Sequence, residues 1–365
     1  MKKNKFMIVS GFLGAGKTTT MIALADYIDK NMGKAAIIVN DLGAKNLVDA
    51  EYTATTGCSV TEITGGCICY QIDNLIDKLR RLRDVQNADI TMSDIHGFGV
   101  GALNFVYHGL HEKFNEEFEL APFLVIVDPM RLRMIMPEKA DINLPEEIAY
   151  LLRSQLAEAD AVALNKIDLL DEGEAGKFVK FLEETCPGVP VFAISAKQKK
   201  NIAEIAEHVM SHTAGLKTVD IGYGGSDFIV AESKLCWYNR RFFIKTWDGG
   251  KIDGNAFIDD FIEGVRSGLA PKKRNIPHLK IFAAGGEDDF GKASLLGVGC
   301  KTEYDKKIEN LHDKFRVIVN GRAACESRLL SPIMDEALEK AVTKNGVECQ
   351  IFFTECFGMM DEGKS

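Results

Sequence analysis

The chain has 365 residues, of which 46% are hydrophobic and 27% charged, the composition of an ordinary soluble globular protein. Such a length usually exceeds one core, so we expect two domains. A net charge of −9 argues against binding of nucleic-acid phosphates, and no apolar run approaches the ~20 residues of a membrane span. We therefore expect a cytoplasmic protein that binds neither nucleic acid nor a membrane.

Short apolar runs alternate with helical patterns in the first part of the chain. We expect strands at 5–10, 35–39, 89–92, 123–127, 161–164 and 189–194, with helices at 18–32, 71–83 and 145–158 among them. Strands that alternate with helices indicate βαβ units in one parallel sheet. The predicted fold class for residues 1–215 is therefore α/β, a parallel sheet with helices on both faces. The phosphate-binding motif described below makes it a P-loop NTPase sheet.

A glycine-rich stretch at 216–227 is expected to be a linker. Beyond it we expect strands at 228–231, 241–246, 279–283, 293–298, 315–319 and 347–353, and helices at 255–267 and 332–343. Helices separated by pairs of strands indicate an antiparallel sheet, with a ferredoxin-like arrangement as one form. Residues 228–365 are thus predicted to form a smaller α+β domain.

The turn after the first strand matches the pattern G-x-x-x-x-G-K-[ST]. Its glycines let the backbone N–H groups point at phosphate oxygens, and the following helix presents its positive end to the same anion. Lys17 is expected to reach the β- and γ-phosphates, and the Thr18 hydroxyl to ligate Mg²⁺. The residues predicted to contact the nucleotide here are Gly11, Gly14, Ala15, Gly16, Lys17, Thr18 and Thr19.

Two later loops carry groups that can read guanine. Asn165, Lys166 and Asp168 follow the strand at 161–164, and a carboxylate at Asp168 can accept the N1–H and N2–H of guanine. The loop of Ser195, Ala196 and Lys197 follows the next strand and can offer a backbone N–H to O6. Because ligands of open α/β sheets bind at the carboxyl ends of strands, these loops favour GTP over ATP.

Acidic residues follow two strands that lie between these motifs. Asp94 is placed to hold Mg²⁺ through water, and Gly97 to contact the γ-phosphate through its N–H. Asp41 is a candidate switch-loop residue near Mg²⁺ or the attacking water. The candidate catalytic residues are therefore Lys17, Asp41 and Asp94, although each carboxylate could instead be an ordinary loop residue or helix cap. His96 is either a water-orienting group or a packed histidine.

Nine cysteines in a chain of this length are not a disulfide framework, and only Cys67 and Cys69 form a close pair. Thiolates two residues apart can share a cation such as Zn²⁺, but a closed tetrahedral site needs about four ligands. Glu62 and Cys58 are the nearest further candidates, and we take Cys67, Cys69 and Glu62 as the candidate transition-metal ligands. The alternative is a pair of buried cysteines with no ligand.

The order of these motifs resembles the CobW-like family of P-loop GTPases. The residues that carry the resemblance are Ser10–Thr19, Val39–Gly43, Glu62–Tyr70, Asp94–Gly97 and Asn165–Asp168. The sequence departs from the family pattern at Tyr70, which replaces a cysteine, and at Gly65, Asp94 and the pair Asp41-Leu42. The resemblance covers most of the predicted P-loop domain.

The resemblance implies GTP hydrolysis coupled to delivery of a metal, or of a metal-containing cofactor such as cobalamin, to a client metalloprotein or corrinoid protein. The implied ligands are GTP, Mg²⁺ and Zn²⁺ or another transition metal, and a homodimer is a further expectation. Because we recognise neither a general base nor an arginine finger in the sequence, we expect slow turnover that a client raises.

Two other functions stay open at this point. A P-loop kinase would need lid arginines near the γ-phosphate, and the candidates are Arg80, Arg81, Arg83, Arg131 and Arg133. A binding module would hold metal or corrinoid and use the nucleotide only structurally.

Overall fold

The computed structural model describes residues 3–41, 48–137, 144–222, 225–247, 249–286 and 288–358. The chain divides into two compact units. Unit 1 takes residues 1–44, 53–140 and 146–228, and unit 2 takes 45–52, 141–145 and 229–365. Short segments of the first half of the chain therefore belong to unit 2.

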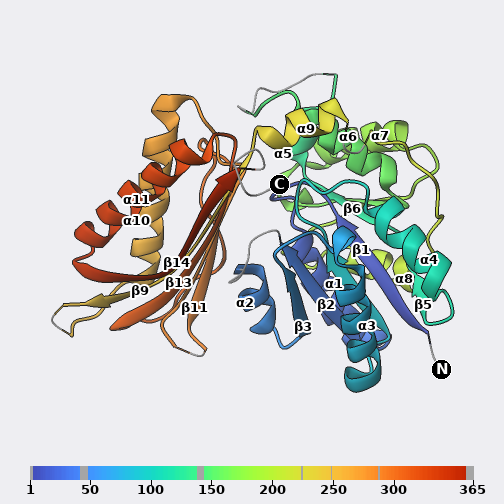
Figure 1. Ribbon diagram of the computed structural model, residues 1–365, viewed down its shortest axis with the longest axis horizontal. Coiled ribbons are helices and arrows are strands. Elements are labelled where there is room, and N and C mark those ends of the chain that lie inside the picture. The colour runs from blue at the N-terminus through green and yellow to red at the C-terminus, as the bar shows by residue number, and fades with distance from the viewer. Residues whose placement is uncertain are drawn as a thin grey trace. The chain divides into compact units, whose positions relative to one another are not determined.

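Unit 1 is built on a parallel sheet of eight strands with the order β3-β2-β4-β1-β6-β7-β8, in which β5 also pairs with β1 (Figure 1). The strands are β1 (Asn4–Ser10), β2 (Ala35–Asp41), β3 (Ser59–Thr64), β4 (Ile90–Asp94), β5 (Phe118–Leu120), β6 (Leu124–Val127), β7 (Ala161–Leu164) and β8 (Val191–Ala193). All of their pairings are parallel, which confirms the predicted α/β class.

The central strands of this sheet are covered on both faces. Every residue of β1, β4, β6 and β7 is buried, as expected for parallel strands between two layers of helices. The α-helices of this part of the chain are α1 (Lys17–Asn31), α2 (Val48–Ala54), α3 (Ile72–Gln86), α4 (Gly109–Phe114), α5 (Pro129–Leu132), α6 (Ile148–Glu158), α7 (Glu172–Thr185), α8 (Ile202–Ser211) and α9 (Ser226–Ser233). The shorter helical turns are η1 (Ile68–Tyr70), the π-helix η2 (Leu103–His108) and η3 (Ile167–Leu169). No helix of the described residues is long and apolar enough to cross a bilayer.

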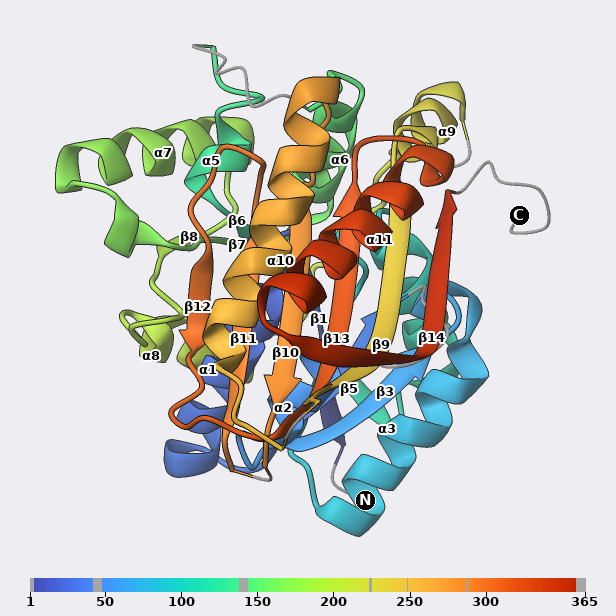
Figure 2. The same cartoon turned by 90° about the vertical axis from the view of Figure 1, so that its left-hand side faces the viewer.

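Unit 2 contains an antiparallel sheet of six strands with the order β12-β11-β10-β13-β9-β14. The strands are β9 (Cys236–Thr246), β10 (His278–Ala284), β11 (Phe290–Leu295), β12 (Glu303–Lys306), β13 (Lys314–Ala323) and β14 (Val347–Gly358). Helices α10 (Gly254–Leu269) and α11 (Ser327–Lys344) cover one face of it, as Figure 2 shows, and η4 (Ala270–Lys272) follows α10. The predicted antiparallel α+β arrangement is confirmed.

The strand expected at 228–231 is wrong, because these residues lie in helix α9. A run of four apolar residues fits a strand or one helical turn equally well. In the helix, Phe228 and Ala231 are buried three residues apart, whereas Ile229 and Val230 are exposed. The short strand β12 was not expected at all.

Residues 48–52 of α2 complete unit 2. Val48 packs against Phe282, Phe290 and Ile318, and its N–H donates to Asn320 Oδ1 at 2.7 Å. Ion pairs add to this contact, with Asp49 bonded to Lys280 and Glu51 bonded through both oxygens to Arg316. No local pattern marks this segment as part of unit 2, since all of these partners lie in the C-terminal part of the chain.

Gly264 allows the two helices of unit 2 to touch, because a Cβ there would lie 2.9 Å from Cα of Ala337. Gly264→Ala is expected to lower the free energy of unfolding by about 1–3 kcal/mol, despite the better helix propensity of alanine. Tryptophan fluorescence during urea unfolding measures the effect, because both tryptophans, Trp237 and Trp247, belong to unit 2. The control is Gly299→Ala, where the added methyl meets nothing within 4 Å. Equal stability of the two variants would contradict the proposed packing constraint.

Candidate nucleotide and thiol site

The predicted phosphate loop joins β1 to α1 through glycines in conformations that other residues rarely adopt. Gly11, Gly14 and Gly16 have φ of +135°, +78° and +99°. A Cβ on Gly11 would lie 2.1 Å from the carbonyl oxygen of Ile126, so only glycine fits there. Lys17 Nζ donates to the Gly11 carbonyl at 2.8 Å, which places the ammonium group over the curled loop.

The loop has the shape and chemistry for a phosphate chain and its cation. It opens the 15-residue helix α1, whose first N–H groups and positive end favour an anion. Thr18 lies in the first turn of that helix, and Asp94 stands directly beside the loop because it is paired in register with Val9. A hydroxyl and a carboxylate on adjoining elements are the oxygen ligands that Mg²⁺ accepts, so these residues fit the ion.

The loop after β4 is pressed against the phosphate loop. A Cβ on Gly97 would lie 2.3 Å from Cδ2 of Leu13 and 2.9 Å from its backbone nitrogen. Asp94 is 5% exposed, and its Oδ1 accepts the N–H of Asn40 at 2.9 Å. Asp41 ends β2 at the same edge of the sheet, but its side chain lies outside the described part of the structure.

Asn165 connects the phosphate loop to the second of the predicted guanine loops. Its Nδ2 donates to the Ala15 carbonyl at 2.9 Å, and its Oδ1 accepts the N–H of Ala196 at 3.0 Å. Lys166 adopts a left-handed conformation with φ of +64°, which turns the chain into η3, where Asp168 lies. The structure therefore brings the two predicted base loops together at the phosphate loop.

The flanking residues of these loops differ in their exposure. Ser195 is buried, and its Oγ accepts the N–H of Gln198 at 3.2 Å. Lys197 lies on the exposed side of the same turn, while Thr19 is half-buried in the first turn of α1.

Cys67 and Cys69 form a close thiol pair, with sulfur atoms 3.0 Å apart in one hydrogen bond. Sharing the proton with Cys69, together with a hydrogen bond to His96, holds the pKa of Cys67 well below its usual range. The same sharing and burial raise the pKa of Cys69. The surroundings therefore favour ionisation of Cys67 over ionisation of Cys69.

The third predicted ligand does not join this pair. Glu62 is exposed on β3, and Tyr70, at the position of a family cysteine, is 70% exposed. Across the described residues, no group of three or more His, Cys, Asp or Glu side chains is arranged to hold a metal ion. A tetrahedral site on Cys67 and Cys69 would therefore need ligands beyond those that the described residues bring together.

Three buried side chains brace the site and were not expected from the motifs. Asn40 donates to the carbonyls of Ile63 and Gly66, in the segment that precedes Cys67. Two residues of α6 hold the loop after Gly97. Gln155 donates to the carbonyls of Gly97 and Gly99, and the Glu158 carboxylate accepts the N–H groups of Gly101 and Leu103 at 2.9 Å each. Only Asn40 stood in a motif, and the helical pattern of α6 gives no sign of such a role.

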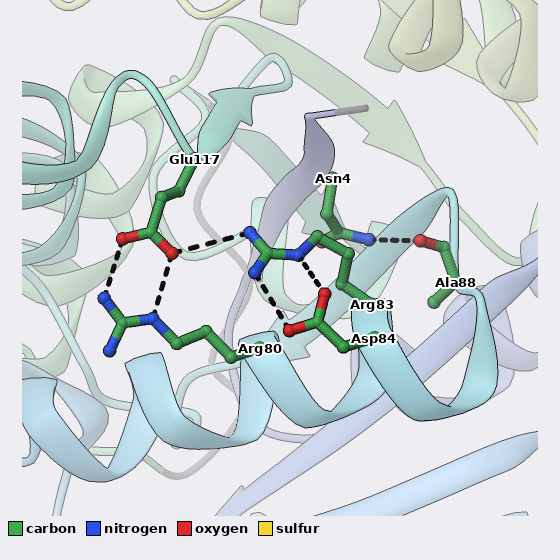
Figure 3. A network of polar contacts seen from close by, with 6 residues as sticks. All are labelled: Asn4, Arg80, Arg83, Asp84, Ala88 and Glu117. Atoms are coloured by element: carbon green, nitrogen blue, oxygen red, sulfur yellow. Dashed lines mark hydrogen bonds and ion pairs between the residues drawn. The ribbon is translucent and has the colours of Figure 1, made fainter. Parts of the chain in front are cut away.

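Two of the arginines considered for a kinase lid, Arg80 and Arg83, are engaged by Glu117. Arg80 and Arg83 converge on Glu117, with Arg80 bonded through two nitrogens at 2.9 and 2.6 Å (Figure 3). Asn4 lies beside these arginines and is the first residue of β1, whereas the phosphate loop follows the last residue of β1. Because a seven-residue strand is about 20 Å long, the length of β1 separates Arg80 and Arg83 from the phosphate loop.

The other three candidates differ in their surroundings. Arg133 pairs with Glu174 and lies over the Phe178 ring, and Arg131 is 2% exposed within the fold. Arg81 is exposed on α3.

A parallel sheet with a glycine loop between its central strand and the next helix defines a P-loop nucleotide-binding protein. Residues 5–193 match the family model described as "CobW/HypB/UreG, nucleotide-binding domain". The match covers more than half of the chain, and the protein belongs to this family.

Several curated relatives match about half of this chain. The zinc chaperone YeiR of Escherichia coli (strain K12) is 31% identical over 165 residues, which are 44% of this chain and 46% of that protein. The zinc chaperone CobW of Sinorhizobium sp is 26% identical over 186 residues, 45% of this chain and 51% of its own length. The chain thus spans about half the length of these relatives.

Two solved structures resemble the fold. HypB from Helicobacter pylori in complex with nickel has 18% identity and a TM-score of 0.41, covering 57% of this chain and 86% of that one. Zn(II)-bound YjiA GTPase from E. coli has 16% identity and a TM-score of 0.36, covering 92% of this chain and 99% of that one.

Burial raises the pKa of Glu158 to about 7, even though the N–H groups of Leu103 and Gly101 and the charge of Lys217 lower it. At pH values between the ordinary carboxyl pKa and about 7, the folded protein therefore binds one proton more than the unfolded protein. Its free energy of unfolding should fall as pH rises through that window, by up to ~3 kcal/mol in total. Denaturation followed by circular dichroism at pH 5 to 8 should show this slope in the natural protein and a flatter one in Glu158→Gln.

Glu117→Gln is the control for that comparison. Arg80 lowers the pKa of Glu117, so this carboxyl titrates below its ordinary value and changes no slope between pH 5 and 8. Parallel slopes for the natural protein and the Glu158→Gln variant would contradict the raised pKa.

Proposed function

We propose that the protein is a Mg²⁺-dependent GTPase whose nucleotide state controls the delivery of a metal ion to a client metalloprotein. The observation that carries the proposal is the position of the thiol pair. The loop of Cys67 and Cys69 is tied through Asn40 to Asp94, beside the phosphate loop. In this proposal, hydrogen bonds through Asn40 link the cargo site to the nucleotide site.

In this proposal the phosphate loop binds the triphosphate of GTP. Backbone N–H groups from Gly11 to Thr19 and the Lys17 ammonium neutralise the phosphate charge. Thr18 and Asp94 would hold Mg²⁺, which supplies charge neutralisation at the β- and γ-phosphates. Asp168 accepts the guanine N1–H and N2–H, while Asn165 and Lys166 shape the pocket and the turn of Ser195, Ala196 and Lys197 faces O6.

Hydrolysis is proposed to be slow in the free protein. Gly97 would offer its N–H to the γ-phosphate, and Asp41 is the proposed switch-loop carboxylate near the attacking water. Among the five candidate arginines, Arg80 and Arg133 pair with glutamates, and we expect an activating group to come from the client. Turnover that rises on client binding suits a timing switch.

Zn²⁺ is the cargo that we propose first. Support comes from the thiol pair and from the names of relatives such as the zinc chaperones YeiR and CobW. Binding would release protons from the thiols, since the thiolate is the ligand. The described residues bring together only two cysteine ligands, and a site with open positions would let the client take part in binding, so that the ion can be passed on. Cobalamin and a corrinoid client are a second proposal that follows only from the family resemblance.

Replacing Asp168 with alanine should abolish the preference for guanine. We expect the ratio of ATP to GTP dissociation constants to fall about 100-fold, because adenine lacks the two N–H groups that the Asp168 carboxylate is proposed to pair with. Titration with fluorescent GTP and ATP analogues measures the ratio. Asp171→Ala is the control, because Asp171 caps α7 by accepting the Glu174 N–H at 2.7 Å.

Labelled γ-phosphate that appears on a small molecule instead of as free phosphate would favour the kinase.

The double change Cys67→Ser, Cys69→Ser should remove metal binding. The natural protein is expected to carry one Zn²⁺ per chain in one of its nucleotide states, and the variant close to none, because serine is a poor ligand for this ion. Elemental analysis after gel filtration with GDP, or with a GTP analogue that resists hydrolysis, measures the content. The control is Cys58→Ser, because this half-buried cysteine precedes β3 whereas the thiol pair follows it. A natural protein without metal in either state would refute the metal-delivery proposal.

A further inference from the structure

Asn40 bonds to the chain on both sides of Cys67. Its side chain is 3% exposed, and three of its hydrogen bonds go to one segment. Nδ2 donates to the carbonyls of Ile63 at 3.0 Å and Gly66 at 2.9 Å, and Oδ1 accepts the N–H of Ile68 at 3.2 Å. Gly66 and Ile68 flank Cys67, so one carboxamide fixes the backbone that carries the thiol.

The main chain of Asn40 contacts the proposed Mg²⁺ site. Its N–H donates to Oδ1 of Asp94 at 2.9 Å, and Asp94 is the carboxylate proposed to hold Mg²⁺. Asn40, near the end of β2, therefore contacts both sites. Its backbone N–H bonds to the Asp94 carboxylate, and its side-chain carboxamide bonds to the loop that carries Cys67. A displacement of Asp94 therefore has a direct mechanical route to the thiol pair.

This route consists of buried bonds that are costly to break. A buried amide that loses its partners is left unsatisfied, so the loop should follow Asn40 and not part from it. Gln71 reinforces the loop, since its Nε2 also donates to the Gly66 carbonyl at 3.2 Å. His96 reaches the thiol of Cys67 itself, whereas Asn40 holds the backbone and so acts whether or not a metal is bound.

We propose that Asn40 is the positioning residue that transmits the state of the nucleotide to Cys67 and Cys69. The proposal rests on the proposed function, because it requires both a guanine nucleotide with Mg²⁺ and a metal on the thiol pair. It adds the residue through which each ligand changes the affinity for the other. Such coupling is reciprocal and is carried by contiguous bonded contacts with two arrangements.

The test is a linkage measurement on the full chain. The dissociation constant of Zn²⁺ is determined by competition with a chelating dye, with Mg²⁺ and GDP and then with Mg²⁺ and a GTP analogue that resists hydrolysis. In the natural protein the two constants are expected to differ about 5- to 150-fold. In Asn40→Ala the ratio is expected to fall to between one and about two, while each ligand still binds.

Asn40→Asp is the second variant, in case alanine prevents folding. It has the same shape and keeps an acceptor for the Ile68 N–H, but its oxygen faces the carbonyls of Ile63 and Gly66. It should lose the coupling as well. The matched control is Asn4→Ala, because Asn4 is 1% exposed and donates to the Ala88 carbonyl at 2.6 Å, at the other end of the sheet. This control removes a buried amide bond and should keep the ratio of the natural protein.

The outcomes separate the inference from the proposed function. A natural protein that binds no guanine nucleotide, or no Zn²⁺ that depends on Cys67 and Cys69, refutes the proposed function. If the natural protein shows the coupling and both Asn40 variants stay within twofold of its ratio, the role of Asn40 is refuted and the function stands. A ratio of one in the natural protein overturns both the role of Asn40 and the proposed control of metal binding by the nucleotide, and leaves a protein that binds the two ligands independently.

Discussion

The parallel pairing of β1 with a strand on each side is the constraint on which the rest of unit 1 depends. Val9 is in register with Asp94 of β4 and also with Leu124 of β6. The chain must then turn at Gly11 against the Ile126 carbonyl, where no Cβ fits. Because all strands of this sheet run in one direction, their carboxyl ends bring the phosphate loop, Asp94 and the base loops to one edge.

Motifs made of adjacent residues could be predicted from the sequence, and the contacts between motifs could not. The phosphate loop and the order of strands around it follow from a local pattern and from the alternation of strands with helices. In contrast, Gln155 and Glu158 brace a loop that lies several elements earlier in the chain, and nothing in an amphipathic helical pattern marks them. Asn40 stood in a motif, but its partners in the cysteine loop became known only from the fold.

Short elements were the least predictable part of the fold. The run at 228–231 fits a strand by composition, yet it is one turn of α9, since four residues do not reveal a period. Strand β3 supports the thiol loop and is only partly buried, so it lacks the apolar run that identified its neighbours. The boundaries of the domains, the individual site residues, the cytoplasmic location and the homodimer stay predictions.

The thiol pair gains its character from its surroundings more than from its sequence spacing. Two cysteines separated by one residue are weak evidence of a site, but here their sulfur atoms share a proton and His96 approaches one of them. Tyr70 takes the place of a family cysteine, so this position adds no third thiol to the pair. The number of ligands, and not only their identity, then decides how firmly a metal ion is held.

Residues 48–52 have a consequence for the way the chain reaches its folded state. They leave the ribosome early, yet the surface that buries Val48 is made by Phe282, Phe290 and Ile318, which are synthesised much later. Domains generally fold as units during synthesis, so this segment must wait, exposed, until most of unit 2 has been made. A fragment that starts at residue 229 would likewise lack part of its own core. Its buried Lys292 would have lost Asp49, one of its two acidic neighbours.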